Sequence, residues 1–461
     1  MMKFILNSED IETDLPAGMT VLDFVRYHKD LKGTKIGCRE GDCGACTVLV
    51  GELIGDKVKY RSMTSCLMPL ANAAGKHIVT VEGINPEDGS LTPVQQAMVD
   101  ESGTQCGFCT VGFVMSLTGF CLNDDRTPEA AISSVDGNIC RCTGYKSIER
   151  AALALSEPPV SAGCQFDGLS ARCTPDYFAE IAGRLGQIHS NEGNVTGRPL
   201  TEAVPTGGGT DLYVQRPEEM AERESRPLLY DEQLRGIRDL GDRVRIGAST
   251  TVTDLLESQV MQAIFPDLYK HLKLVSSTPI RNMATLAGNF VNASPIGDMT
   301  VWFLALDAEI SVRTGNGSDR VLPLRELYLG YKQLAKQPDE IIIAIRFKKP
   351  TGDFRFNFEK VCKRTYLDIA TVNTAISLTM DGDAIAAAHV AAGGVGPIPM
   401  YLKKTSAFLL GKKPTEEMIT AAIEIMQSEI SPISDVRGTA EYKRLLLRQL
   451  FRAHFVEMFG L

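Results

Sequence analysis

Nine of the twelve cysteines of this 461-residue chain lie within its first 155 residues. Cys38, Cys43 and Cys46 follow one another as C-x4-C-x2-C, and Cys66 lies twenty residues further on. This is the spacing of plant-type 2Fe–2S ferredoxins, in which four thiolates hold one cluster. Glycines at positions 37, 41 and 44 would let the loop wrap closely and turn its amides inward. The alternatives are a zinc site, although zinc usually takes two close cysteine pairs, and ordinary buried cysteines.

A second group consists of a C-x2-C pair, Cys106 and Cys109, and a C-x-C pair, Cys140 and Cys142. Both pairs are expected at helix boundaries, where amides and the helix dipole favour thiolates. By themselves the four thiols fit a second 2Fe–2S cluster, a zinc site or a thiol–disulfide motif. The ferredoxin-like loop nearby favours a second cluster. Cys121 lies in an apolar helical segment and is expected to pack in the core.

Two later segments suit a polar ligand. The run Thr206-Gly207-Gly208-Gly209-Thr210-Asp211 permits a nest of backbone N–H groups for a pyrophosphate. It is not a G-x-G-x-x-G fingerprint, because the pattern fails at Leu212, and a tight turn is the alternative. The stretch 281–298 is crowded with small and hydrogen-bonding residues. That composition suits backbone beside a polar ligand, and a loop at a sheet edge is the alternative.

The elements that must hold these residues follow from hydrophobic periodicity and helix caps. Residues 2–70 are predicted to form a small α/β domain that begins with a strand, followed by a helix capped by Thr20. Strands over 47–50 and 57–60 are predicted to flank a turn at Gly51 and Gly55.

Residues 76–155 predict a small helical bundle. Its predicted helices cover 93–99 and 112–117, with others beginning at Pro128, after a Thr127 cap, and at 147. A Pro- and Gly-containing stretch then predicts a linker. Beyond it, strands such as 244–246 and 340–345 mix with helices such as 253–256 and one from 415.

Composition narrows the classes of function. Lys and Arg total 48 and Asp and Glu total 57, giving a net charge of −9, which argues against a nucleic-acid partner. No apolar run is long enough for a membrane span, and the first residues lack the apolar stretch of a signal peptide. We therefore expect a cytoplasmic protein with no membrane partner, of about three domains at ~150 residues each. In that compartment a cysteine cluster indicates metal or redox chemistry.

Three runs together resemble the xanthine dehydrogenase, or molybdenum hydroxylase, family. They are Cys38-Arg39-Glu40-Gly41-Asp42-Cys43-Gly44-Ala45-Cys46, Gln105-Cys106-Gly107-Phe108-Cys109-Thr110 and Cys140-Arg141-Cys142-Thr143-Gly144-Tyr145. They occur in the family's order, and the glycine run and the 281–298 stretch resemble its FAD-binding domain. One departure is Val111-Gly112, where the family usually has Pro-Gly; the helix start is expected to shift slightly while the ligands stay the same.

The resemblance implies a multidomain α+β fold. Residues 1–75 would form a ferredoxin-like β-grasp 2Fe–2S domain and 76–157 a helical-bundle 2Fe–2S domain. After a linker over 158–174, residues 175–350 would form an α+β FAD-binding domain. Residues 351–461 would form the flavoprotein C-terminal α+β domain.

The resemblance also implies which residues contact the cofactors. The first cluster would take Cys38, Cys43, Cys46 and Cys66, and the second Cys106, Cys109, Cys140 and Cys142. Thr206, Gly207, Gly208, Gly209, Thr210 and Asp211 would cradle the FAD pyrophosphate. Thr285, Gly288, Asn289, Ser294 and Asp298 match flavin-contacting or loop-shaping positions. Ile342 aligns with an apolar residue beside the isoalloxazine ring, and Lys360 with a lysine near the flavin.

The function implied is that of the electron-transfer subunit of a split xanthine dehydrogenase. Hydroxylation of hypoxanthine or xanthine would occur at molybdopterin in a larger partner chain, with no catalytic residue for that step in this chain. Electrons would pass through the second cluster, the first cluster and FAD to NAD+. Gln105 would face the partner's pterin, and two small and two large chains would assemble. The alternatives are an aldehyde or N-heterocycle hydroxylase subunit, a stand-alone iron–sulfur flavoprotein carrier, or a zinc-stabilised scaffold.

Overall fold

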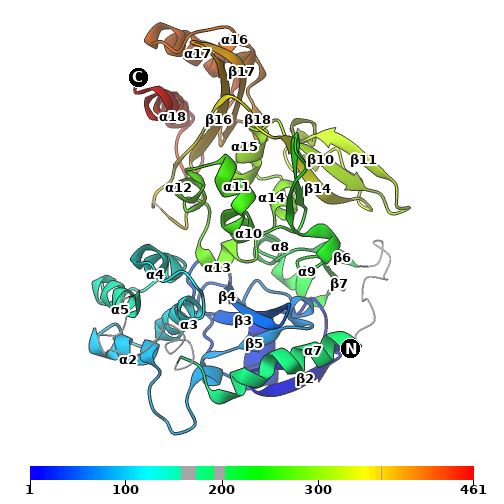
Figure 1. Ribbon diagram of the computed structural model, residues 1–461, viewed down its shortest axis with the longest axis vertical. Coiled ribbons are helices and arrows are strands. Elements are labelled where there is room, and N and C mark those ends of the chain that lie inside the picture. Colours follow the sequence, from blue (N-terminus) through cyan, green and yellow to red (C-terminus); the bar gives the residue numbers. More distant parts are fainter. Residues whose placement is uncertain (157–172, 192–202, 365) are drawn as a thin grey trace. The chain divides into compact units, whose positions relative to one another are not determined.

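The computed structural model describes residues 1–156, 173–191, 203–364 and 366–461. The chain divides into two compact units, each described here by itself (Figure 1). The first contains residues 1–229 and 277–283, and the second contains 230–276 and 284–461. The predicted linker, 158–174, falls mostly on residues outside the described ranges.

A five-stranded mixed sheet forms the base of the first unit. Its strands are β1 (Met2–Leu6), β2 (Glu9–Thr13), β3 (Thr47–Ile54), β4 (Lys57–Thr64) and β5 (His77–Val79). The order is β2-β1-β5-β3-β4, with β1 and β5 parallel and the other neighbours antiparallel. The short helix α1 (Val21–Asp23) is capped by Thr20, whose side chain accepts from the Asp23 amide, as predicted. This is the expected ferredoxin-like domain.

The hairpin between β3 and β4 is longer than predicted. Gly51 lies inside β3 opposite Tyr60, and a Cβ on it would come within 2.6 Å of the Tyr60 ring. The turn is at Gly55, whose φ of +63° favours glycine. The prediction of a turn at both glycines was therefore wrong for Gly51, because that residue is glycine to make room for a neighbouring ring rather than to reverse the chain.

Four helices form the predicted bundle. They are α2 (Pro93–Asp100), α3 (Thr110–Cys121), α4 (Pro128–Ser134) and α5 (Lys146–Ser156). Thr92 and Thr127 cap α2 and α4, each with proline in the first turn, which confirms the cap predicted at Thr127. Helix α3 is buried along almost its whole length and packs against β3, so it joins the bundle to the first sheet (Figure 1).

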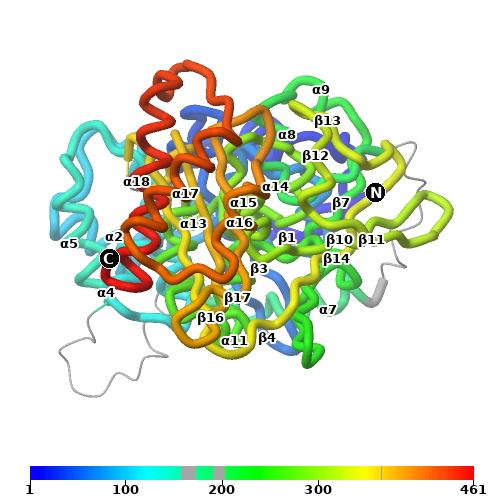
Figure 2. Tube along the Cα trace, turned by 90° about the horizontal axis from the view of Figure 1, so that it is seen from above, coloured from blue at the N-terminus to red at the C-terminus, as the bar shows by residue number. Residues whose placement is uncertain are grey.

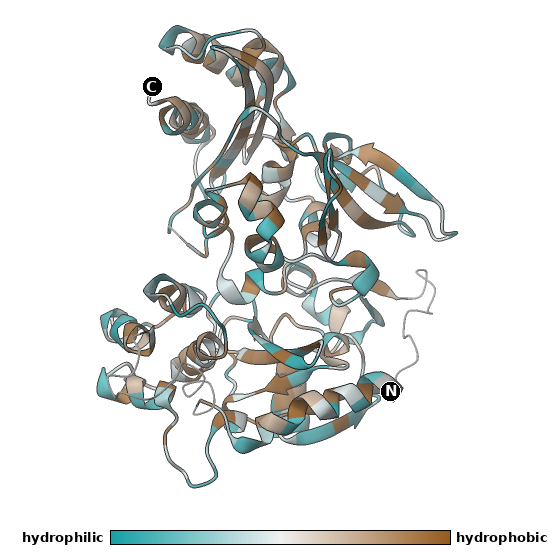
Figure 3. Ribbon diagram, viewed as in Figure 1, coloured by the Kyte–Doolittle hydropathy of each residue, from teal (hydrophilic) through white to brown (hydrophobic). Residues whose placement is uncertain are grey.

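Helix α7 (Ile181–Asn191) belongs to the first unit and packs on the first sheet. Its hydrophobic and polar residues alternate along the helix, as Figure 3 shows. Ile181 and Leu185, one turn apart, are fully buried in a cluster with Ile5 of β1. Residues 181–191 were predicted to lie at the start of the FAD-binding domain. The periodicity of a helix does not indicate the sheet on which the helix packs.

Several short elements complete the first unit. They are β6 (Val204–Thr206) and β7 (Ser225–Pro227), which pair in parallel, and the helices α8 (Leu212–Gln215), α9 (Pro217–Glu222) and α13 (Thr278–Arg281). Helix α13 packs against β4, although the residues on both sides of segment 277–283 belong to the second unit.

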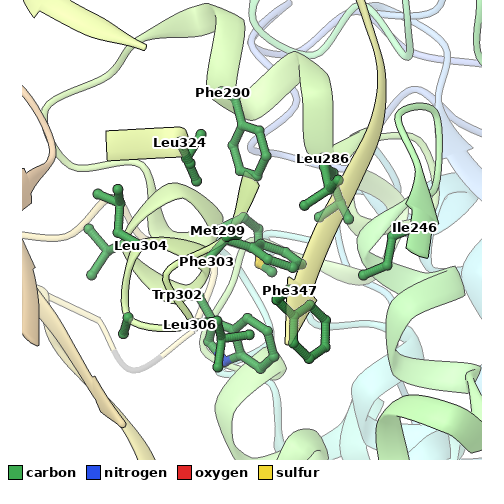
Figure 4. Packing of buried hydrophobic residues seen from close by; sticks show 14 of the residues in the cluster. Ile246, Leu286, Phe290, Met299, Trp302, Phe303, Leu304, Leu306, Leu324 and Phe347 are labelled. Carbon is green, nitrogen blue, oxygen red and sulfur yellow. The ribbon is translucent and has the colours of Figure 1, made fainter. Parts of the chain in front are cut away.

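The second unit begins with a five-stranded antiparallel sheet in the order β11-β10-β14-β9-β8. Its strands are β8 (Ile237–Asp239), β9 (Arg243–Gly247), β10 (Glu309–Arg313), β11 (Asp319–Pro323) and β14 (Ile341–Lys348). Its helices are α10 (Val252–Glu257), α11 (Gln259–Ile264), α12 (Leu268–Leu272), α14 (Leu286–Asn292) and α15 (Asp298–Leu304). The core around Trp302, Phe303, Phe290 and Phe347 lies between helices and sheet (Figure 4).

A four-stranded sheet and three helices form the C-terminal part of the second unit. The strands are β15 (Asp353–Val361), β16 (Val372–Asp381), β17 (Ala384–Gly393) and β18 (Met400–Tyr401). The helices are α16 (Lys403–Leu409), α17 (Glu416–Glu429) and α18 (Ala440–Phe459), with Thr415 capping α17. Helix α16 packs on β17 and α18 on β15 and β16 (Figure 2). A two-stranded sheet, β12 (Tyr328–Gly330) with β13 (Gln333–Leu334), lies earlier in this unit.

Mixed helix and sheet content in several domains confirms the predicted fold class. Within the described ranges, no helix has both the length and the apolar character needed to span a bilayer.

Candidate functional site

The first cysteine set lies on the loop before β3 and on the turn after β4. Cys46 and Cys66 are buried, whereas Cys38 and Cys43 are partly exposed. Backbone amides point at the sulfur atoms: the Glu40 N–H donates to Cys38 Sγ at 3.3 Å. Such amides stabilise negative charge on sulfur, which is what a thiolate-bound cluster requires.

Within this set the thiols come together in two pairs. A hydrogen bond with Cys43 lowers the pKa of the Cys38 thiol to about 5, and the same contact raises the pKa of Cys43. A hydrogen bond with Cys66 lowers the pKa of the Cys46 thiol against the opposing effect of burial. The sequence predicted that four thiols would gather, but spacing alone did not predict which would pair.

The second set is also paired, and it lies at the edge of the helical bundle. Cys106 and Cys142 are exposed, and their sulfur atoms are 3.6 Å apart. Cys109 is the N-cap residue of α3, as its predicted place before a helix requires. Burial raises the pKa of the Cys109 thiol, and its hydrogen bond with Cys140 raises it further.

The environment of Cys140 favours a thiolate. Burial opposes ionisation, but hydrogen bonds from Thr143 lower the pKa of Cys140. The Thr143 N–H and Oγ1 lie 3.4 and 3.1 Å from Cys140 Sγ. Cys142 lies before Lys146, the first residue of α5. Of the two pairs that are close in sequence, only Cys106 and Cys109 directly adjoin the start of a helix.

A set of four thiols arranged as two close pairs suits a binuclear cluster, because a 2Fe–2S centre takes four thiolates shared between two iron ions. Among the described residues, no three His, Cys, Asp or Glu side chains are grouped as ligands for one metal ion. Each set of four thiols supplies the ligand number of one 2Fe–2S cluster, which is also that of one zinc site. Cys121 is fully buried at the end of α3 beside Cys173, which confirms its predicted place in the core.

The glycine run Thr206–Asp211 lies in the first unit between β6 and α8. A Cβ on Gly208 would lie 1.8 Å from the Met283 carbonyl oxygen, and one on Gly209 would lie 2.3 Å from the Leu67 carbonyl oxygen. Gly209 also has a φ of +84°. Gly209 thus allows the loop to lie directly against Leu67, the residue that follows Cys66, and Gly208 allows it to lie against Met283.

A buried amide lies beside this loop. Asn72 is 1% exposed, and its Nδ2 donates to the Gly207 carbonyl at 2.8 Å. Its Oδ1 is buried and finds no hydrogen-bond partner within the described residues. An amide oxygen accepts hydrogen bonds, as do the oxygens of a pyrophosphate, so Asn72 Oδ1 would not bind that group. The pyrophosphate-binding role of the loop stays a prediction.

The five predicted residues of the 285–298 stretch lie in the second unit, where they first of all shape α14 and α15. Thr285 caps α14 by accepting from the amide of Gly288, which is exposed. Asn289 Oδ1 accepts from the Thr300 N–H and Oγ1, both at 3.0 Å. Ser294 Oγ accepts from the Ile296 N–H at 3.4 Å.

Asp298 and Lys360, distant in sequence, form a buried ion pair. Lys360 Nζ lies 2.7 Å from Asp298 Oδ2 and donates to the Leu274 carbonyl at 2.8 Å, and its side chain is 1% exposed. Asn373 Nδ2 donates to the other carboxylate oxygen at 2.5 Å. Asn373 Oδ1 has no hydrogen-bond partner in the described part of the chain. Sequence reasoning missed Asn373, which no motif marks.

Ile342, predicted to lie beside the isoalloxazine ring, is a buried residue of β14. The β-bulge at Ser311/Val312 places it opposite Val312, and its side chain joins the buried core of the second unit. Its neighbour Ile343 is also buried but lies outside that cluster. The structure therefore gives the Ile342 side chain a packing role.

Four models of known protein families match successive parts of the chain. A model described as the 2Fe-2S iron-sulfur cluster binding domain matches residues 4–71, and one described as the 2Fe-2S binding domain matches 80–153. The model of the FAD binding domain in molybdopterin dehydrogenase matches 197–350. The model of the CO dehydrogenase flavoprotein C-terminal domain matches 358–458.

Individual proteins are also similar to this chain. The xanthine dehydrogenase of Emericella nidulans is 31% identical over 90% of this chain, and aldehyde oxidase 2 of Macaca fascicularis is 27% identical over 99%. The chain spans 35% and 39% of the length of these two relatives. A chain of carbon monoxide dehydrogenase from Hydrogenophaga pseudoflava, solved without the Mo-pyranopterin moiety, is 27% identical with a TM-score of 0.52. That match covers 55% of this chain and 88% of the other.

Two paired cysteine sets, a glycine loop and a domain that matches the flavoprotein C-terminal model thus occur in one chain. By domain content and sequence, the chain is similar to the iron–sulfur and FAD-binding portion of the molybdenum hydroxylases.

Proposed function

We propose that this chain is the electron-transfer subunit of a split xanthine dehydrogenase. A partner chain would hydroxylate hypoxanthine or xanthine at molybdopterin, and this chain would pass the electrons to NAD+. The observation that carries the proposal is the arrangement of eight thiols as four close pairs in two sets. Iron–sulfur clusters exchange single electrons and a bound flavin exchanges one or two, so together they connect a two-electron oxidation to a two-electron acceptor.

The chain's own residues supply the ligands. Cys38, Cys43, Cys46 and Cys66 would hold one cluster, and Cys106, Cys109, Cys140 and Cys142 the other. Backbone amides and the Thr143 hydroxyl stabilise the negative charge on sulfur. Free thiols of this kind persist in a reducing compartment, which supports a cytoplasmic location.

For FAD, we assign the pyrophosphate to the glycine loop of residues 206–211. Within the second unit, Asp298 orients Lys360, the lysine whose proposed role is to stabilise the flavin, and the exposed Gly288 leaves α14 without a side chain at its first turn. A buried cation near the flavin favours its reduced, anionic form. Thr285, Asn289 and Ser294 then act by shaping the segments around Asp298.

The partner would dock at the second cysteine set. Gln105, Cys106, Phe108 and Tyr145 are exposed together at that edge of the bundle, and Phe108 is 48% exposed. An exposed aromatic beside an exposed ligand pair suits a protein interface. We propose that Gln105 contacts the partner's pterin and that two chains of each kind assemble. The carbon monoxide dehydrogenase chain, 88% covered by this likeness, supports a separate polypeptide for the flavin part.

A second substrate class has its own support. The match to an aldehyde oxidase is nearly as extensive as the match to xanthine dehydrogenase, so this portion serves several substrates in its relatives. An aldehyde or another N-heterocycle is therefore the alternative substrate.

The test is a native pull-down of this chain from its own cells, with the eluate assayed for molybdenum and for xanthine-dependent NAD+ reduction. Xanthine turnover with a large co-purifying molybdenum protein is the expected result. Molybdenum without xanthine turnover would move the substrate to aldehydes or other heterocycles. Absence of both partner and molybdenum would reject the split enzyme in favour of a stand-alone carrier. A Cys121→Ser chain, altered in the core away from the paired sets, is the matched control.

A further inference from the structure

The two cysteine sets are joined by one backbone hydrogen bond. The Ile139 N–H donates to the Cys43 carbonyl oxygen at 3.0 Å. Cys43 belongs to the first set, and Ile139 directly precedes Cys140 of the second. A short run of covalent bonds and this single hydrogen bond therefore connect a sulfur atom of one set with a sulfur atom of the other.

Asn138, the residue before Ile139, fixes this junction. Its side chain is buried, with Nδ2 donating to the Gly44 carbonyl at 3.1 Å and Oδ1 accepting from Ser116 Oγ at 2.8 Å. Gly44 follows Cys43, and Ser116 belongs to α3, the helix that starts at Cys109. One amide thus links the first cysteine loop, the second cysteine loop and α3.

Glycines allow the two loops to approach this closely. A Cβ on Gly44 would lie 2.4 Å from both Asn138 Nδ2 and the Gly137 carbonyl oxygen. A Cβ on Gly112 of α3 would lie 2.2 Å from the Gly44 carbonyl oxygen. Gly44 also has a φ of +68°, which other residues rarely adopt. A larger residue at Gly44 or Gly112 would force the loops apart and lengthen the Ile139–Cys43 hydrogen bond.

We propose that Asn138 is a positioning residue for electron exchange between the two metal centres. It holds the Ile139 N–H against the Cys43 carbonyl, so that the two cysteine sets are coupled through that hydrogen bond. One electron leaves one centre and enters the other, and no bond or proton changes place. Asn138 contacts none of the sulfur atoms itself. The inference rests on the proposed function, because it requires both sets to hold clusters.

The first test compares Asn138→Ala with the unchanged protein, each isolated with its partner. Electron paramagnetic resonance of the dithionite-reduced protein gives the two cluster signals, and rapid freezing after one-electron photoreduction gives the rate at which they equilibrate. We expect both signals to remain and equilibration to slow severalfold. The matched control is Asn282→Ala, which removes another buried amide of the same unit, one that donates to the Ser62 carbonyl at 2.8 Å.

Ser116→Ala is the second variant, in case Asn138→Ala loses a cluster. It leaves the loops and glycines intact and frees only the Asn138 Oδ1, so we expect a smaller slowing with both signals present. Equilibration at the unchanged rate in Ser116→Ala, together with an Asn138→Ala effect no larger than that of Asn282→Ala, would overturn the proposal. Absence of both cluster signals from the unchanged protein would instead refute the proposed function on which it rests.

Discussion

Arg281 and Asp136 form a buried ion pair in the first unit, with Arg281 Nη2 2.7 Å from Asp136 Oδ2 and neither side chain more than 6% exposed. Asp136 Oδ1 also accepts the Thr278 N–H at 2.6 Å. These bonds tie α13, which lies far along the chain, to the residues that follow α4. They hold the segment 277–283 in the first unit.

Asp136→Asn is expected to lower the free energy of unfolding by about 3–5 kcal/mol, because it leaves the Arg281 charge buried and uncompensated. Urea midpoints measured by circular dichroism would show the loss. The comparison is Glu12→Gln, which breaks the exposed pair with Lys3 and should cost less than about 1 kcal/mol. Equal effects of the two substitutions would contradict a special role for the buried pair.

Cys106→Ser is expected to lower the iron content of the purified protein from about four to about two atoms per chain, because one of two binuclear clusters loses a ligand. Metal analysis with sulfide determination measures this. Cys121→Ser should keep all the iron, since Cys121 is a core residue. Zinc in place of iron, or unchanged iron in Cys106→Ser, would count against the ligand assignment.

Lys360→Met is expected to lower the midpoint potential of the bound flavin, because it removes the cation that would stabilise the reduced form. It also leaves the Asp298 carboxylate without its partner, so stability should fall as well. The double variant Lys360→Met/Asp298→Asn should recover stability but keep the lower potential. Potentiometric titration of the flavin absorbance, with thermal unfolding in parallel, separates the two effects. A potential unchanged in both variants would remove Lys360 from the flavin site.

His77 predicts an acid-sensitive first unit. It is fully buried, with Nδ1 2.7 Å from the Tyr60 hydroxyl and Nε2 2.9 Å from the Asn7 carbonyl oxygen. Burial lowers the pKa of His77 to about 3. The unfolded chain, with a pKa near 6.5, binds a proton first as pH falls. Stability from this residue is therefore complete above about pH 6.5 and is lost toward pH 3, at up to about 1.4 kcal/mol per pH unit.

Urea unfolding at several pH values, followed by a probe in the first unit, measures that slope. His77→Gln keeps a side-chain donor and an acceptor but cannot become charged in this range, so its stability should vary less between pH 6 and 4. An identical pH dependence in the two proteins would show that other groups control the acid sensitivity.

Local features of this fold were predictable from sequence, and long-range contacts were not. Thr20 and Thr127 cap helices as predicted, because a cap depends on residues only three positions apart. Cys109 also precedes α3, and Cys121 of α3 lies in the core, as predicted. By contrast, Gly51 was taken for a turn residue because the neighbouring ring that requires its small size comes from the opposite strand.

The same division holds at the candidate site. Spacing grouped the cysteines into two sets, but the pairing of Cys106 with Cys142 depends on how the bundle folds. Nothing in the sequence marks Asn138, because its role arises only where two loops and α3 meet. Ile342 lies in the buried core of the second unit, and its place beside the isoalloxazine ring stays a prediction. The β-bulge at Ser311/Val312, which sets its register with β10, has no signature in the hydrophobic pattern.

The packing of α7 on the first sheet has a consequence for synthesis of the chain. Ile5 is synthesised before the helical bundle, whereas its core partners Ile181 and Leu185 are added only after it. Domains generally fold as they leave the ribosome. Here, however, the ferredoxin-like domain emerges with part of its sheet uncovered and waits for a helix made about 175 residues later. Chaperones and the machinery that inserts clusters would therefore meet the ferredoxin-like domain in that open state.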